Sequence, residues 1–283
     1  MTVAVLGLGE AGHLIATDLV RAGANVRGYD PRVPAPAGVH PAGSDADACR
    51  GADLVLSVNS AAEALDALIQ GLPGCRAGTI WADLNTAAPG VKQALVAAAG
   101  PHAVIVVDVA IMAPVPPRAL ATPMTASGQG AGAFAELMRS WGATVDVLEG
   151  PVGAAATHKL LRSVFYKGLA AAVVEALAAA RAAGLEEWLR GNIADELVQA
   201  DSSTLDRLVT GSVTHAARRS HEMAAAAELL DGLGVPALVT RASHEWLVQL
   251  SAPNGPYTPA RDPDRLDDPE PAGGDPARGL PAG

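Results

Sequence analysis

The chain has 283 residues, enough for two domains of ordinary size, and a formal net charge of −10. Nucleic-acid binding draws on Lys and Arg side chains that neutralise phosphates, so this acidic balance argues against a nucleic-acid partner. Hydrophobic residues make up 49% of the chain but aromatic residues only 3%. The core must therefore consist mainly of Ala, Val and Leu, which suits helices packed on a parallel sheet.

Short β-branched runs alternate with Ala-rich segments of helical length from Thr2 to Gly150. The predicted strands are Val3–Leu6, Val26–Asp30, Leu54–Val58, Thr79–Leu84, Val104–Val109, Pro123–Ala126 and Thr144–Leu148. Strands separated by helices indicate βαβ crossovers. The pattern predicts an α/β Rossmann domain over residues 1–150, with a mainly parallel, doubly wound sheet.

After Gly153 the strand signal ends and long Ala/Leu helices follow, with a period of about 3.6 residues. We expect glycines to separate these helices, at Gly184, Gly211 and Gly234. The pattern predicts an all-helical domain over residues 151–250. Residues 251–283 are rich in Pro, Gly and Asp and are expected to form a disordered tail.

A glycine-rich loop, G-L-G-E-A-G, follows the first predicted strand and opens the first helix. In a dinucleotide-binding loop, Gly7 would allow the tight turn, Gly9 would let the backbone approach a pyrophosphate, and Gly12 would let helix and strand pack. The helix N-terminus attracts the anion. We therefore expect this loop, including Glu10 and Ala11, to bind a nicotinamide dinucleotide.

The end of the second predicted strand bears on the choice of cofactor. Asp30 would accept hydrogen bonds from the adenosine ribose hydroxyls, and its charge would repel a 2′-phosphate. This favours NAD. Arg32, two residues further on, could bind that phosphate, so NADP stays an alternative.

The helix after Gly150 carries a polar stripe. Its apolar residues predict a helix that packs against its own domain; they are Leu160, Leu161, Val164, Phe165 and Leu169. Another face then presents Lys159, Ser163 and Lys167 at four-residue steps. A lysine that is desolvated beside a second cation has a lowered pKa and can act as an acid or base. The alternative interpretation is a stripe of solvent-facing lysines.

The sequence from about Thr2 to Leu250 resembles the β-hydroxyacid dehydrogenases, which include 6-phosphogluconate and 3-hydroxyisobutyrate dehydrogenases. The motifs behind this resemblance are G-L-G-E-A-G, A-D-L-N-T at Ala82–Thr86, V-D-V-A-I-M at Val107–Met112 and the G-x-x-G…K helix of Gly150–Lys159. The resemblance implies that Lys159 is catalytic. It also implies that Asn85 and Thr86 lie where cofactor and substrate meet, and that Val58 and Asn59 flank the cofactor.

The chain departs from this family at two places. Met112, Ala113 and Pro114 replace the Ser-Gly-Gly that binds the substrate carboxylate in typical members, and Ser163 replaces an asparagine. The usual substrates are therefore in question. The stretches A-I-M-A-P-V-P-P and H-A-A-R-R-S-H-E-M resemble a branch labelled phosphogluconate dehydrogenase-like through its C-terminal domain, a label that does not establish the substrate.

The segment His215–Met223 is dense in polar residues, and a solvated helix face explains it. The alternative is that Arg218 and Arg219 bind a substrate anion, with a partner subunit as one source, because arginine pairs well with carboxylates and phosphates. No cluster of Cys, His and Asp indicates a metal site. Cys49 and Cys75 are expected to be reduced thiols of a cytoplasmic protein.

These observations favour an oxidoreductase that transfers a hydride between a nicotinamide cofactor and a hydroxy acid or its carbonyl, with Lys159 moving the proton. Imine reduction and a dinucleotide-binding sensor without turnover are the alternatives. We expect a small-molecule substrate and a homodimer formed through the helical domain, whose helices carry wide apolar stripes. No membrane partner is expected, because Glu175 and Arg181 interrupt the apolar stretch Gly168–Ala183 and Met1–Leu8 lacks the basic start of a signal peptide.

Overall fold

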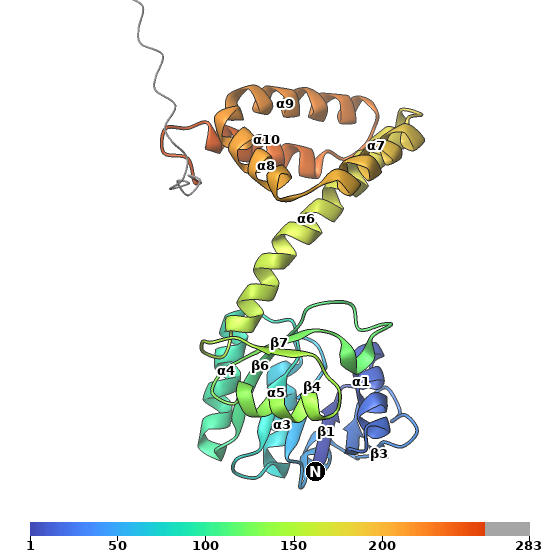
Figure 1. Cartoon of the computed structure of the whole chain (residues 1–283), viewed down its shortest axis with the longest axis vertical. Helices are drawn as coiled ribbons and strands as arrows, with labels where there is room; N and C mark the ends of the chain where they lie inside the picture. Colours follow the sequence, from blue (N-terminus) through green and yellow to red (C-terminus); the bar gives the residue numbers. More distant parts are fainter. Residues whose placement is uncertain (258–283) are drawn as a thin grey trace, which may run out of the picture. The chain divides into compact units, whose positions relative to one another are not determined.

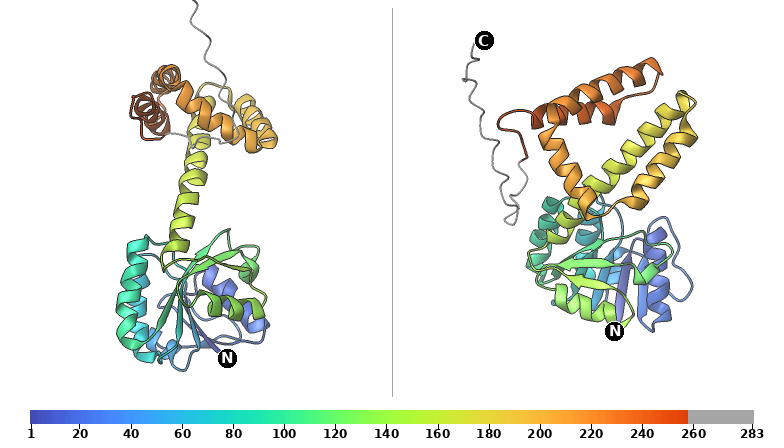
Figure 2. Two further views of the ribbon diagram at one scale, coloured as in Figure 1. Left: turned by 60° about the vertical axis from the view of Figure 1, so that its left-hand side comes forward. Right: turned by 45° about the horizontal axis from the view of Figure 1, so that its top comes forward.

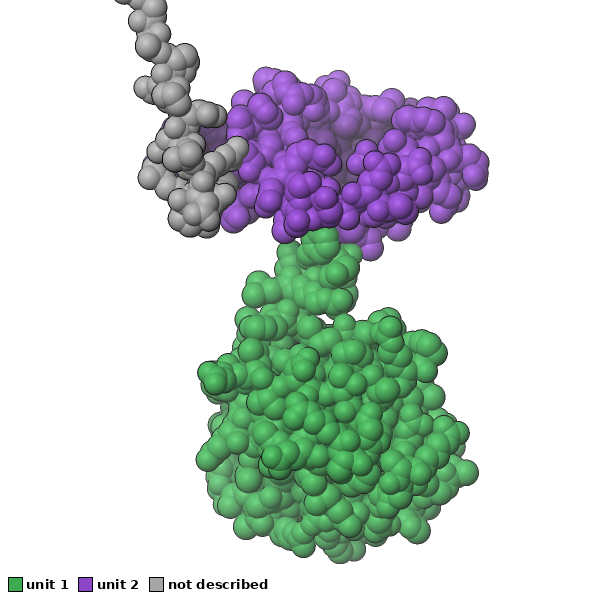
Figure 3. Space-filling view, viewed as in Figure 1, with its two compact units in different colours: residues 1–168 green, residues 169–283 purple. Residues whose placement is uncertain are grey.

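The computed structural model describes residues 1–257, and the chain divides into two compact units, Met1–Gly168 and Leu169–Gly283 (Figure 3). One long helix, α6 (Ala154–Ala182), contributes residues to both units. The tail predicted for residues 251–283 lies outside the described residues from position 258 onward.

The first unit contains an eight-stranded sheet in the order β3-β2-β1-β4-β5-β6-β7-β8 (Figure 1). The strands are β1 (Thr2–Leu6), β2 (Asn25–Tyr29), β3 (His40–Pro41), β4 (Leu54–Ser57), β5 (Ile80–Asp83), β6 (Ile105–Ile111), β7 (Met124–Ser127) and β8 (Val145–Val147). Neighbouring strands are parallel except β6 and β7, which are antiparallel. The mainly parallel, doubly wound sheet is confirmed. The two-residue strand β3 was not predicted, because His40–Pro41 is too short to show a pattern.

Helices cover both faces of this sheet (Figures 1 and 2). They are α1 (Glu10–Arg21), α2 (Asp45–Cys49), α3 (Ala64–Gly71), α4 (Pro89–Ala99) and α5 (Ala131–Ser140), with short 3-10 turns at Leu72–Gly74, Gly100–His102 and Ala119–Ala121. Successive strand residues point to opposite faces. In β1, Val3 and Val5 therefore join one core while Ala4 and Leu6 join the other.

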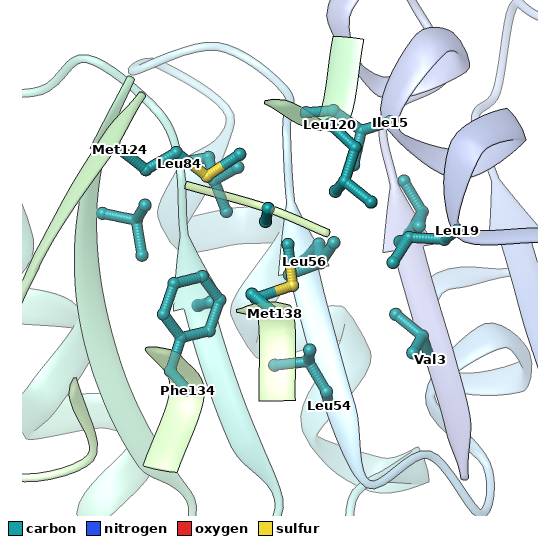
Figure 4. Close-up of a cluster of buried hydrophobic side chains, with 14 of the residues drawn as sticks. Val3, Ile15, Leu19, Leu54, Leu56, Leu84, Leu120, Met124, Phe134 and Met138 are labelled. Atoms are coloured by element: carbon teal, nitrogen blue, oxygen red, sulfur yellow. The ribbon is translucent and has the colours of Figure 1, made fainter. Parts of the chain in front are cut away.

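The two cores take their helices from different parts of the first unit. The first core combines strand residues with Ile15 and Leu19 of α1 and with Phe134 and Met138 of α5 (Figure 4). The second core contains residues of α2, α3 and α4 packed around Trp81, which is fully buried. Strands covered on both faces read as continuous apolar runs, which is why the sequence pattern located them well.

The described part of the second unit is helical. Beyond α6 it contains α7 (Glu186–Gln199), α8 (Ser202–Thr214), α9 (Ala216–Gly232) and α10 (Leu238–Leu250). Gly184 and Gly234 lie in the connections after α6 and α9 with φ values of +75° and +70°, which favour glycine.

The prediction of a helix boundary at Gly211 is wrong, because this glycine lies inside α8. A Cβ at Gly211 would lie 2.9 Å from the guanidinium of Arg219, so the glycine makes room for a side chain of the next helix. The breaks on either side of it precede Ser202, where Asp201 and Thr204 form a capping box, and fall at His215, between α8 and α9.

Glu175 connects α6 to the start of α10. Its carboxylate accepts hydrogen bonds from the backbone N–H groups of Val239 and Thr240, both at 2.8 Å, and from the Thr240 hydroxyl at 2.7 Å. Burial opposes ionisation, but these hydrogen bonds outweigh it and lower the pKa of Glu175. The residue before α10, Ala237, has no capping side chain, so Glu175 supplies the cap from another helix.

The middle of α6 differs from the expectation that it packs against its own domain. Leu161, Val164 and Phe165 have 66%, 74% and 56% of their surface exposed. Among the described helices, α6 is the one long and apolar enough by length and composition to cross a membrane, with a mean hydropathy of 1.4. This is weak evidence for a membrane span, because apolar helices that pair with other helices in soluble proteins share these properties.

Candidate functional site

The glycine-rich loop between β1 and α1 is shaped by close backbone contacts. Gly7 has a φ of +92°, and a Cβ there would lie 2.5 Å from the carbonyl oxygen of Val58. A Cβ at Gly12 would overlap the carbonyl oxygen of Gly7. Gly9, by contrast, has no neighbouring atom within 4 Å of where its Cβ would be, and no side chain caps the helix there. The loop therefore leaves open space in front of the N-terminus of α1, as binding of an anion requires.

Asp30, which follows β2, is tied to this loop. One carboxylate oxygen accepts a hydrogen bond from the N–H of Leu8 at 2.8 Å, and the other accepts from the N–H groups of Arg32 at 2.8 Å and Val33 at 3.0 Å. Burial opposes ionisation, but these hydrogen bonds and the charge of Arg32 outweigh it and lower the pKa of Asp30. Asp30 thus holds the glycine loop in place, a role that the sequence alone did not indicate.

A cleft of about 380 Å³ opens beside the loop. It brings together many of the residues proposed from the sequence, namely Gly9, Glu10, Ala11, Val58, Asn59, Asn85, Thr86, Ala113 and Lys159. Three further lining residues, Leu84, Ile111 and Val115, were not predicted. All three are apolar, so nothing in their chemistry distinguished them from core residues.

Other proposed residues do not line this cleft. Gly7, Gly12, Asp30 and Arg32 support or flank the loop, Met112 and Pro114 flank Ala113, and Ser163 and Lys167 lie further along α6. Arg32 is exposed and lies 3.4 Å from Glu63. Arg218 and Arg219 belong to α9 in the second unit, where Arg218 pairs with Glu222 and Arg219 donates to the Ser212 hydroxyl at 3.2 Å.

Lys159 is half-buried in the second turn of α6 and lines the cleft. Burial lowers its pKa, and the positive charges of Lys92 and Lys167 lower it further, while Asp108 acts in the opposite direction. A lysine with a lowered pKa can exchange a proton closer to neutral pH than a free lysine can. The side chain is therefore suited to general acid–base chemistry.

Two asparagines at the cleft carry unpaired acceptors. The side-chain oxygens of Asn85 and Asn59 are buried and have no hydrogen-bond partner among residues 1–257. The Asn85 amide nitrogen is already used, because it donates to Ser57 at 3.1 Å and to Asp83 at 2.5 Å. Buried acceptors normally find a donor, so these atoms fit a ligand that carries N–H or O–H groups. Together with the open space at Gly9, they fit a nicotinamide dinucleotide.

Arg162 connects α6 to the loop that carries Ala113. Its guanidinium donates to the carbonyl oxygen of Met112 at 2.9 Å and lies 4.4 Å from the centre of the Tyr166 ring. This contact holds α6 to the loop beside Ala113, which lines the cleft. Arg162 was not predicted from the sequence, because it lies between the residues of the lysine stripe.

A buried ionic cluster below the cleft was also missed. Lys92 of α4 lies between Asp83 and Asp108, and all three side chains are fully buried. A signal was present, because both aspartates interrupt apolar strands within the motifs A-D-L-N-T and V-D-V-A-I-M. Charged residues are rarely buried without a partner, so two such aspartates predict a buried cation.

The glycine loop, the acid after β2 and the lysine-lined cleft define a nicotinamide-dinucleotide-binding protein of the Rossmann class. Residues 2–143 match the NAD binding domain of 6-phosphogluconate dehydrogenase, and residues 180–250 match a domain of unknown function, DUF1932. The chain belongs to the oxidoreductase family that carries this 6-phosphogluconate dehydrogenase NAD binding domain.

Several solved structures resemble the chain, whereas none of the curated protein sequences matches it. A conserved hypothetical protein from Sinorhizobium meliloti 1021 is 30% identical over 88% of each chain, with a TM-score of 0.58. A conserved protein of unknown function, described as structurally similar to 3-hydroxyacid dehydrogenases, is 26% identical over 88% of this chain and 96% of its own, with a TM-score of 0.58.

An imine reductase from Myxococcus stipitatus in complex with NADP+ shares the fold, at 17% identity and a TM-score of 0.73 over 88% of this chain and 93% of its own. Its V8 variant, in complex with NAD+, is 18% identical with a TM-score of 0.70 over 87% and 92%. At these identities the likeness concerns the fold alone.

The glycine loop yields a paired test of folding and binding. Gly12→Ala should lower the free energy of unfolding by about 1–2 kcal/mol, because overlap with a backbone oxygen outweighs the gain of about 1 kcal/mol in helix propensity. Gly9→Ala meets no protein atom, so the cofactor-free protein should keep its stability while NADH binding weakens.

Chemical denaturation without cofactor and a fluorescence titration with NADH measure the two effects. Wild-type NADH affinity in Gly9→Ala would show that the open space at Gly9 is not where a dinucleotide binds.

Proposed function

We propose that the chain is an NAD(P)-dependent dehydrogenase or reductase of the β-hydroxyacid dehydrogenase type. It interconverts a hydroxy acid and its carbonyl form, with Lys159 as the general acid and base. The observation that carries this proposal is that Lys159, whose pKa is lowered by burial and by two nearby cations, lines one cleft with Gly9, Asn85 and Thr86. The family match to an NAD binding domain supports the same reaction class.

The proposed chemistry separates hydride transfer from proton transfer. When bound, a nicotinamide cofactor accepts or donates the hydride. In the oxidation, the neutral amine of Lys159 takes the proton of the substrate hydroxyl as the carbon–oxygen double bond forms. In the reduction, the protonated amine returns that proton to the carbonyl oxygen. Asn85 and Thr86, which line the same cleft, are proposed to orient the reacting groups.

The cleft bears on the kind of substrate. Three apolar residues that line the cleft, Ile111, Ala113 and Val115, lie in or beside the segment Met112–Pro114, which replaces the carboxylate-binding Ser-Gly-Gly of typical relatives. We therefore propose a substrate that places an apolar group against these residues. A screen of hydroxy acids and their phosphorylated forms, followed by nicotinamide absorbance, identifies it.

Imine reduction is the second candidate, and the shared fold with imine reductases supports it. Lys159 favours the alcohol–carbonyl reaction, because that reaction moves a proton to or from oxygen. A sensor without turnover is the third candidate. Tight cofactor binding combined with no turnover of hydroxy acids, carbonyls or imines would favour the sensor.

Lys159→Ala should reduce turnover by roughly two to four orders of magnitude, the usual contribution of a positioned proton-transfer group. NADH affinity should change little, because the glycine loop and Asp30 belong to other elements than Lys159. In the wild type, the oxidation rate should rise with pH through a midpoint below the ordinary lysine value, because the neutral amine is the active form.

Steady-state kinetics across pH measure these effects, and Lys167→Ala is the matched control, since this exposed lysine lies two turns further along α6. We expect a smaller loss in the control. Near-normal turnover of Lys159→Ala would contradict the proposed role.

The cofactor preference is proposed to be NAD over NADP, because the Asp30 carboxylate would repel a 2′-phosphate. Asp30→Ala should narrow the preference for NAD over NADP. It should also weaken the binding of both cofactors, since Asp30 accepts a hydrogen bond from the N–H of Leu8 in the glycine loop. Arg32→Ala is the control for the alternative that Arg32 binds the phosphate.

Specificity constants for the two cofactors decide between these roles. A large NADP preference of the wild type, lost in Arg32→Ala, would overturn the assignment to Asp30.

We further propose that the chain is a cytoplasmic homodimer formed through its helical unit. An apolar groove of about 420 Å³ lies between α6, α7, α9 and α10, and its lining residues Trp188 and Leu229 are 65% and 60% exposed. Exposed apolar surface of this kind favours association.

Sedimentation equilibrium should report a dimer at micromolar concentration, and Trp188→Glu should shift it toward monomer. A monomeric wild type would contradict the proposal.

A further inference from the structure

Lys92 is a cation enclosed in the first unit. Lys92 belongs to α4, and its side chain is fully buried. Its ammonium lies 2.6 Å from a carboxylate oxygen of Asp83 and 2.9 Å from one of Asp108. It also donates to the carbonyl oxygens of Asp83 at 3.0 Å and Asn85 at 2.8 Å. These contacts hold the ammonium in one position, because leaving them would leave a buried charge without partners.

The two aspartates depend on this cation. Asp83 and Asp108 are register partners on the adjacent parallel strands β5 and β6, so their side chains point to the same face. Two buried carboxylates side by side repel each other, and the ammonium of Lys92 between them offsets that repulsion. In their ionised forms the three groups leave one net negative charge below the cleft.

The cluster contacts Asn85, a residue that lines the cleft. Lys92 donates to the Asn85 carbonyl oxygen, and Asp83 accepts from the Asn85 side-chain nitrogen. These two bonds fix the residue at both its backbone and its side chain. The unpaired side-chain oxygen of Asn85 is thereby fixed at the cleft.

The cluster also contacts the start of α6, the helix that carries Lys159. The second oxygen of Asp108 accepts hydrogen bonds from the N–H groups of Gly153 at 3.1 Å and Ala156 at 2.8 Å. The hydroxyl of Ser127 accepts from the N–H of Ala155 at 3.0 Å. Lys159 follows Ala156 by three residues on the same helix. By holding the first turn of this helix, Asp108 positions Lys159 at the cleft.

We propose that Lys92 is a positioning residue for the reaction at this cleft: it holds Asn85 and, through Asp108, the first turn of α6. The inference rests on the proposed acid–base role of Lys159.

Substitutions that remove opposite charges from the cluster should move the pKa of Lys159 in opposite directions. Besides burial, the groups that act on the pKa of Lys159 are Lys92 from α4, Lys167 from α6 and Asp108 from β6. Lys92→Met leaves the two carboxylates without their cation and should raise the pKa of Lys159. Asp83 is not among these groups but pairs with Lys92, so Asp83→Asn removes a negative charge from the same cluster and should lower the pKa of Lys159 by a smaller amount.

Combining the two substitutions separates charge from position. Lys92→Met/Asp83→Asn keeps the net charge of the cluster, and the amide that Asp83→Asn introduces can donate to Asp108. The pKa of Lys159 should therefore return toward its wild-type position. Asn85 nevertheless lacks its ammonium partner, so the plateau turnover at high pH should stay below that of the wild type.

The experiment is an NMR titration of the full chain without cofactor, after reductive methylation with a ¹³C label. Lys159→Arg identifies the signal of Lys159. The matched control is Asp53→Asn, which removes a carboxylate just before β4, next to Thr2 at the other end of the strands. We expect the Lys159 midpoint to move to higher pH in Lys92→Met, to lower pH in Asp83→Asn, and to stay unchanged in the control.

The pH profiles of turnover should move in the same directions as these midpoints. At a pH below the midpoint, each pH unit by which the midpoint rises should lower the rate of oxidation about tenfold. If Lys92→Met does not fold, Asp83→Asn and the double variant still carry the test. Opposite movements of the midpoint without turnover of any substrate would support the inference and contradict the proposed function. Turnover that depends on Lys159, with a midpoint that does not move or moves the same way in both single variants, would overturn the inference.

Discussion

The carboxyl ends of β1, β4, β5 and β6 lie at one edge of a parallel sheet, and the rest of the molecule depends on what is placed there. Parallel strands bring the residues that follow them to the same edge, so the glycine loop, Asn59 and Asn85 become neighbours although they are distant in sequence. Beyond β6, the strand β7 runs antiparallel, β8 runs parallel to β7, and the chain then enters α6. The second turn of α6 brings Lys159 to the cleft beside the glycine loop.

Holding charged groups at that edge requires a buried counter-charge. Asp108 anchors the first N–H groups of α6, which a helix N-terminus leaves without partners inside the helix. Asp83 anchors Asn85, and Lys92 lets both carboxylates stay buried side by side. Removing one partner of such a cluster exposes the others to repulsion, so its geometry is more tightly fixed than that of a surface ion pair.

Much of the first unit could be predicted from sequence, because strands buried on both faces are continuous apolar runs and because Gly7 and Gly12 each have a steric reason for being glycine. The helices after Gly153 were also recognisable, but Gly211 was misread. A glycine that makes room for Arg219 has the same sequence signal as one that ends a helix.

The buried contacts of Lys92 and the loop contact of Arg162 depend on which elements become neighbours, which the local pattern does not specify. The same limit explains α6. Its apolar stripe predicted packing, but Leu161, Val164 and Phe165 stay exposed within one chain. A periodic pattern shows that a face is apolar and does not identify what covers it.

The proposed function requires a nicotinamide ring in the cleft beside Lys159. A crystal structure of the full chain with NADH would locate this ring. We expect the pyrophosphate against the first turn of α1 at Gly9, the ring between Lys159 and Thr86, and a donor of the ligand on the side-chain oxygen of Asn85. A dinucleotide bound away from the glycine loop, or a ring outside the cleft that contains Lys159, would show that the proposed function is wrong.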